Sequence, residues 1–137
     1  VGIKPGDRDT QDIADIFGLP APEVMKLLLH EPAQVPGLAS MTDEQVIRLA
    51  GDRIAHAMYT WEPYMHNPKL RYRLHRITVP TLLLWGASDG VVSVAYAEAY
   101  RQMIPGATLV VIPEAGHLPH IEQPNAVLQH VLAFVAQ

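Results

Sequence analysis

The clearest indication of the fold lies in Val79-Pro80-Thr81-Leu82-Leu83-Leu84-Trp85-Gly86-Ala87-Ser88-Asp89-Gly90, in which an apolar run ends at a glycine turn. A second apolar run, Thr108-Leu109-Val110-Val111-Ile112, ends at Pro113. Unbroken runs of this length are typical of parallel strands that are buried on both faces. Each run is followed by residues at helical spacing, which are Val94, Ala97, Arg101 and Ile104, then Val127, Leu128, Val131, Leu132 and Val135. The order strand, helix, strand, helix predicts an α/β fold.

The loops that follow the two predicted strands carry an acid and a base. The first loop is Gly86–Gly90, which contains Asp89, and the second is Pro113–His117. A strand–helix–strand crossover makes its strands parallel, so both loops lie at the same edge of the sheet. Ligands bind at this edge in open α/β sheets. We therefore expect Asp89 and His117 to meet although they are far apart in the sequence.

A carboxylate beside an imidazole is a chemically useful pair. A neutral imidazole can take a proton from a nucleophile at neutral pH. A buried carboxylate on its other nitrogen selects the tautomer and stabilises the imidazolium. Gly116 allows the backbone to turn sharply just before His117.

The segments Pro80–Asp89 and Pro105–His117, with the tail Gly116-His117-Leu118-Pro119-His120-Ile121-Glu122-Gln123-Pro124-Asn125, resemble the last two strands of the α/β-hydrolase family. In that family the acid follows the penultimate strand and the histidine follows the last one. The resemblance covers residues 77–137, while residues 1–76 resemble the helical cap that precedes these strands. It implies a C-terminal fragment of an α/β-hydrolase, with a helical cap (lid) region, 1–76, and a strand–helix–strand–helix part of a parallel-sheet core, 77–137.

The resemblance implies a hydrolase that cleaves a carboxylic ester or a C–C bond beside a carbonyl in a small molecule. Asp89 and His117 would be the acid and base of a nucleophile–His–Asp triad, and no cofactor or metal is implied. Val91, Leu118 and Trp61 are expected to contact the substrate. The family also needs an oxyanion-hole loop and a nucleophile elbow before the cap, and this sequence contains neither. The isolated chain is therefore predicted to be inactive.

Other interpretations of these residues stay open. Gly86-Ala87-Ser88-Asp89-Gly90 matches the G-x-S-x-G pattern of a nucleophile elbow, but only one strand follows it, which disfavours Ser88 as the nucleophile. Asp89 could instead be a helix N-cap before Val91. His117 could be an ordinary loop histidine, and His117 with His120 forms an H-x-x-H pattern that lacks a third metal ligand.

The first part of the sequence predicts helices joined by proline-rich loops. Helices are expected over Asp9–Leu19, from Pro22 onward, and after Asn67-Pro68. Thr42-Asp43-Glu44-Gln45 is a capping-box pattern that begins another helix. An apolar group in this region predicts cap core, and the alternative is that one or more of its residues line a substrate pocket; the group consists of Met41, Met58, Tyr59, Trp61, Tyr64 and Met65.

Composition excludes several classes of protein. The 137 residues carry a net charge of −4 with no basic run, which argues against nucleic-acid binding. No 18-residue apolar stretch or signal-like segment is present, so we expect no membrane association and a cytoplasmic location. Two parallel strands are too few for a stable sheet. We therefore expect the chain to associate through its sheet edge with a missing N-terminal half or as a homo-oligomer. The alternative function is a non-catalytic truncated fragment that folds by this association.

Overall fold

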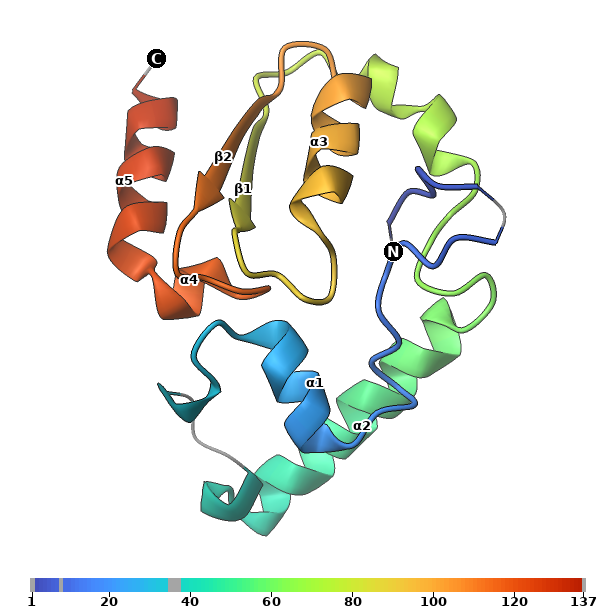
Figure 1. The fold of residues 1–137 in the computed structure, drawn as a ribbon, viewed down its shortest axis with the longest axis vertical. Coiled ribbons are helices and arrows are strands. Elements are labelled where there is room, and N and C mark those ends of the chain that lie inside the picture. Colours follow the sequence, from blue (N-terminus) through green and yellow to red (C-terminus); the bar gives the residue numbers. More distant parts are fainter. Residues whose placement is uncertain (1, 8, 35–37, 137) are drawn as a thin grey trace.

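A computed structural model describes residues 2–7, 9–34 and 38–136 of the chain. Two strands, β1 (Leu82–Gly86) and β2 (Thr108–Ile112), pair in parallel from Leu82 opposite Thr108 to Gly86 opposite Ile112. Helices α3 (Val94–Met103) and α5 (Pro124–Val135) contact both strands and lie on opposite sides of them (Figure 1). The predicted α/β arrangement with parallel strands is confirmed.

Helix α3 anchors the sheet to the N-terminal segment. The Ser93 side chain caps the helix by accepting the Tyr96 amide. Tyr96 is buried, and its hydroxyl donates to the Ile3 carbonyl over 2.8 Å. In β1, the Trp85 indole donates to the carbonyl of Val92, in the loop between β1 and α3, over 2.8 Å. The core therefore draws on both the first and second parts of the chain, and it contains Ile3, Ile13, Met65, Leu74, Val91, Val92, Tyr96 and Ile104.

Two α-helices stand in the first part of the chain. Helix α1 (Ala21–Leu28) begins at Pro20 and buries Val24, close to the start that Pro22 predicted. It lies next to the carboxyl ends of the strands (Figure 1). Helix α2 (Asp43–Thr60) begins with the predicted capping box, because Thr42 and Gln45 each accept the other's amide with their side chains.

The prediction of a helix over Asp9–Leu19 is wrong. These residues form bends, because carboxylates capture the amides that a helix would need. Asp15 accepts the Phe17 and Gly18 amides over 2.8 and 3.0 Å, and Asp7 accepts the Thr10 amide over 2.8 Å. The helix predicted after Asn67-Pro68 is likewise replaced by short 3-10 turns, Leu70–Tyr72 and Leu74–Arg76. Two further 3-10 turns, Pro32–Gln34 and Leu38–Ser40, precede α2.

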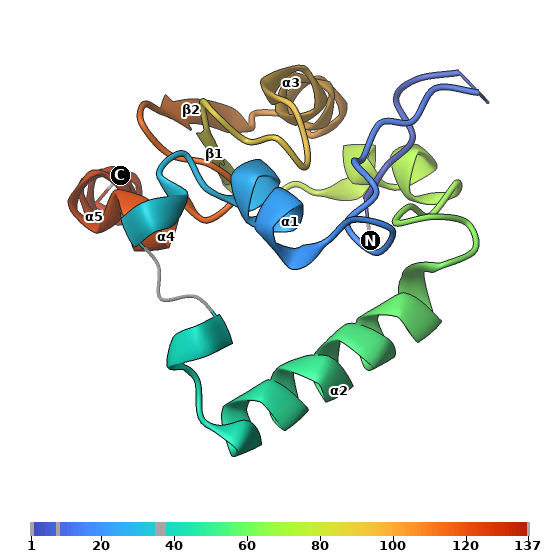
Figure 2. The ribbon, with the colours of Figure 1, turned by 60° about the horizontal axis from the view of Figure 1, so that its bottom comes forward.

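The apolar face of α2 is exposed. Met58, Tyr59 and Trp61 are 79%, 86% and 61% exposed, so the prediction that they form cap core is wrong. Figure 2 shows α2 running apart from the sheet. Met65 is buried, and Tyr64 packs against the core. Helical periodicity predicts which face of a helix is apolar, but it does not predict whether another part of the protein covers that face.

The apolar stripe of α5 is also largely exposed, at Leu128, Leu132 and Val135. A short helix, α4 (Pro119–Glu122), links β2 to α5. None of the helices in the described ranges is long and apolar enough to cross a membrane.

Candidate active site

Asp89 lies in the loop after β1, and backbone bonds join this loop to the end of β2. The Ala87 amide donates to the Ile112 carbonyl and the Ser88 amide donates to the Ala115 carbonyl, each over 2.9 Å. One carboxylate oxygen of Asp89 accepts the amides of Val91 and Val92, each over 2.9 Å. Asp89 thus caps the turn before α3 with one oxygen and keeps the other oxygen for a second partner.

The second partner is His117. Its ring atom Nδ1 lies 2.9 Å from Oδ2 of Asp89, whose side chain is only 4% exposed, while the imidazole is 37% exposed. Because a neutral imidazole carries one proton, an Nδ1–H donated to Asp89 leaves Nε2 as an acceptor. The arrangement can therefore accept a proton at Nε2 and stabilise the resulting cation at Nδ1.

The approach of the two loops depends on a glycine at the end of β1. A Cβ atom on Gly86 would lie 1.9 Å from the Gly116 carbonyl oxygen and 2.4 Å from that of Ala115. Any side chain at position 86 would therefore separate the loop of Asp89 from the loop of His117. In the second loop, Glu114 takes a positive φ of 50°, and the His117 amide donates to the Leu28 carbonyl over 2.7 Å.

A cavity of about 360 Å³ opens beside His117. Its wall is mostly apolar and comes from the N-terminal segment, α1, α2, β1, α3 and the loops between them. The lining residues include Ile16, Leu28, His56, Met65, Leu83, Trp85, Val91, Val92, Tyr96 and Tyr100. Of the three residues expected to contact a substrate, Val91 lines this cavity. Leu118 is half-buried at the start of α4, and it lines neither this cavity nor the one described next.

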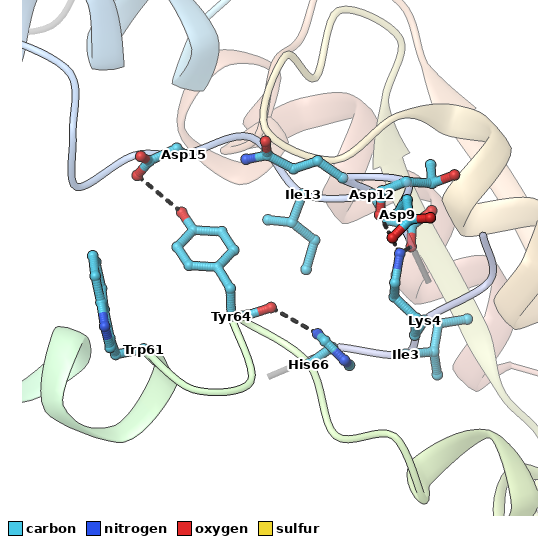
Figure 3. A pocket seen from close by; sticks show the side chains of 11 residues that line it. Ile3, Lys4, Asp9, Asp12, Ile13, Asp15, Trp61, Tyr64 and His66 are labelled. Atoms are coloured by element: carbon cyan, nitrogen blue, oxygen red, sulfur yellow. Dashed lines mark hydrogen bonds and ion pairs between the residues drawn. The ribbon is translucent and has the colours of Figure 1, made fainter. Parts of the chain in front are cut away.

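Trp61 lines a different cavity, of about 350 Å³, between the N-terminal segment and the end of α2 (Figure 3). Lys4 and Asp12 form an ion pair of 2.9 Å in its wall. Tyr64 points toward Asp15, and burial raises the pKa of its phenol. Neither Asp89 nor His117 lines this cavity, so the structure does not bring Trp61 together with them.

Ser88 forms a hydrogen bond with a different histidine, His30. Its Oγ lies 2.9 Å from Nδ1 of His30, and both residues are exposed. Within the described ranges the His30 ring meets no carboxylate, so it lacks the orienting group that Asp89 provides to His117. Sequence reasoning missed His30, because a single histidine in a loop has no distinguishing pattern.

Sequence reasoning also missed Glu122. One of its oxygens, Oε1, accepts the amides of His30 and Glu31 over 2.7 and 3.0 Å, while Oε2 accepts the Gly116 amide over 2.6 Å. The one feature of the sequence that could have indicated a role for Glu122 is its position shortly after His117 in the tail Gly116–Asn125.

Known proteins resemble parts of this chain. The family model described as the α/β-hydrolase fold matches residues 69–124. A pimeloyl-[acyl-carrier protein] methyl ester esterase of Pectobacterium atrosepticum is 43% identical over 70 residues, which are 51% of this chain and 28% of that protein. Monoacylglycerol lipase ABHD6 of Mus musculus is 29% identical over 121 residues, which are 83% of this chain and 34% of that protein.

Among solved structures, a bacterial membrane phospholipase A aligns with a TM-score of 0.66 and 25% identity. The alignment covers 84% of this chain and 36% of the phospholipase. The chain thus spans about a third of the length of the curated relatives it matches. The family match, the relatives and the parallel-strand fold agree, and together they support the assignment of this chain as a fragment of an α/β-hydrolase.

Proposed function

We propose that this chain supplies the acid and base of an ester hydrolase, with Asp89 as the acid and His117 as the base. The observation that carries the proposal is the 2.9 Å contact between His117 Nδ1 and a carboxylate that is 4% exposed. The named activities of the relatives, a methyl ester esterase and a monoacylglycerol lipase, support ester hydrolysis. Residues 1–76 act as the cap and residues 77–137 as part of the core.

The reaction follows from the tautomer that Asp89 selects. A nucleophilic hydroxyl from the remaining length of the hydrolase attacks the ester carbonyl, and His117 Nε2 takes its proton. Asp89 stabilises the imidazolium, which then protonates the departing alkoxide. Water attacks the acyl-enzyme by the same proton route, releasing the carboxylic acid and restoring the hydroxyl. Backbone amides outside this chain hold the oxyanion.

The cavity beside His117 favours an apolar acyl group. Its lining is dominated by aliphatic and aromatic side chains, and Val91 is our proposed substrate contact within it. No cofactor takes part in the proposed reaction. Contacts of Leu118 and Trp61 with substrate stay predictions.

The test is hydrolysis of p-nitrophenyl esters by a longer protein that contains this chain and the rest of the hydrolase. His117→Ala should lower kcat by about 10⁴-fold or more, because the base of a triad is lost. His120→Ala is the matched control, since His120 is an exposed histidine in the same segment, and its kcat should not change. Equal activity of the two variants would show that His117 is not the base.

The isolated chain is proposed to be inactive and to need a partner. In the described ranges the sheet has two strands, so each strand keeps one edge unpaired. We propose that the rest of the hydrolase, or a second copy of the chain, pairs there. Analytical ultracentrifugation of the isolated chain tests self-association, and a stable monomer would leave the rest of the hydrolase as the partner.

Ser88 provides the test of the competing assignment. Its hydrogen bond to His30 is the observation in favour of a Ser88–His30 dyad. If the isolated chain hydrolyses esters and a fluorophosphonate labels Ser88, Ser88 is the nucleophile and the proposal of an external nucleophile fails. The proposal predicts no labelling of this chain alone.

A further inference from the structure

A short segment of the cap region crosses both loops of the candidate site. This clamp segment, residues 27–31, begins at the end of α1. The Leu27 carbonyl accepts the Gly90 amide over 3.0 Å, and the Leu28 carbonyl accepts the His117 amide over 2.7 Å. The segment therefore touches the chain directly beside Asp89 and at His117 itself.

The clamp segment packs backbone against backbone. A Cβ atom on Gly116 would lie 2.5 Å from the Leu28 carbonyl oxygen and 2.9 Å from the Leu29 Cα. A Cβ atom on Gly90 would lie 3.0 Å from the Leu27 Cα. Both loops have a glycine where the segment passes, so the close approach is built into the sequence of each loop.

The Glu122 side chain connects the clamp segment to the loop that carries His117. Its Oε1 binds two amides of the segment, at His30 and Glu31, while its Oε2 binds the Gly116 amide over 2.6 Å. Hydrogen bonds to a carboxylate are stronger than bonds between neutral groups. The Glu122 side chain thus links Gly116, the residue before His117, to the end of the clamp segment and limits how far the two can move apart.

We propose that Glu122 is a positioning residue, which acts through Gly116 and the clamp segment to hold the His117 imidazole on Asp89. The proposal rests on the proposed function for its catalytic meaning, while its geometric content concerns this chain alone. Both carboxylate oxygens are needed, because one serves each side of the junction. An amide side chain has one acceptor oxygen, so it can serve only one side.

Amide exchange and imidazole NMR on the longer protein that contains this chain and the rest of the hydrolase test the proposal without requiring turnover. In Glu122→Gln, the amide of Gly116 or those of His30 and Glu31 should exchange about tenfold to a hundredfold faster, because one side of the junction loses its acceptor. The hydrogen-bonded Nδ1–H resonance of His117 should broaden or disappear. The matched control is Glu114→Gln, which removes the same charge from an exposed residue of the loop that carries His117 and should change neither signal.

Two outcomes would overturn the proposal. In the first, Glu122→Gln leaves the Nδ1–H resonance of His117 as in the original chain, so the imidazole does not depend on the junction. In the second, amide protection falls uniformly over the whole chain, so Glu122 supports global folding and not the position of His117. Because neither measurement uses a substrate, a failure of the proposed ester hydrolysis would appear separately, as intact NMR signals in an inactive enzyme.

Discussion

Replacing Gly86 with alanine should separate the two loops that carry Asp89 and His117. The new Cβ would stand 1.9 Å from the Gly116 carbonyl oxygen, whereas ordinary contact begins at 3.4 Å. The loops must therefore move apart by about 1.5 Å, because the obstructing atoms are backbone and cannot rotate away. A shift of this size would take the 2.9 Å contact between His117 Nδ1 and Asp89 Oδ2 beyond hydrogen-bonding distance.

The cost in stability has two parts. Overpacking a close-packed site costs about 1–3 kcal/mol. Each hydrogen bond lost between the loops, such as that from the Ser88 amide to the Ala115 carbonyl, adds about 1 kcal/mol. We expect a loss of about 3 kcal/mol or more in the free energy of unfolding, which is a large part of what a small domain possesses.

Urea denaturation of the longer protein that contains this chain, followed by circular dichroism, measures this loss, and the Nδ1–H resonance of His117 reports the separation of the loops. The control is Gly51→Ala in α2, where a Cβ atom would meet nothing within 4 Å. This change should raise stability by about 0.5–1 kcal/mol, because alanine favours a helix interior. If Gly86→Ala unfolds at the same urea concentration as the original chain and keeps the His117 resonance, the inferred contact between the loops is wrong.

Three further predictions concern the Asp89 carboxylate, the capping box of α2, and the phenols of Tyr96 and Tyr100. Asp89→Asn should lower kcat of the complete hydrolase by about 10⁴-fold with little change in fold, because an amide favours the wrong tautomer of His117; unchanged kinetics would remove Asp89 from the mechanism. Thr42→Ala should cost about 1 kcal/mol and speed amide exchange in the first turn of α2, since the capping box is lost. Burial raises the pKa of Tyr96 and of Tyr100, so stability should be constant up to about pH 10 and fall above it as the unfolded chain ionises first. Tyrosinate absorbance and urea midpoints on both sides of that pH check the last prediction, and ionisation of all five tyrosines of this sequence near pH 10 in the folded protein would contradict it.

The local sequence pattern predicted secondary structure correctly where the structure of a segment depends mainly on its own residues. The apolar runs at β1 and β2, the capping box at Thr42 and the proline near the start of α1 all form the predicted elements. The pattern failed over Asp9–Leu19, because Asp7 and Asp15 bind nearby amides more favourably than a helix would. It also could not say that the apolar face of α2 is uncovered, since burial depends on what else is present.

Two parallel strands joined by a helix, with an acid and a histidine after them at one edge, can be predicted from the amino-acid sequence, because apolar run length and crossover handedness are local or topological properties. The groups that support the acid and the histidine could be found only from the folded chain. The clamp segment 27–31, the three amides on Glu122 and the bond between Ser88 and His30 join residues distant in sequence. Such contacts depend on which distant segments pack together, and the local pattern of residues in one segment does not record that packing.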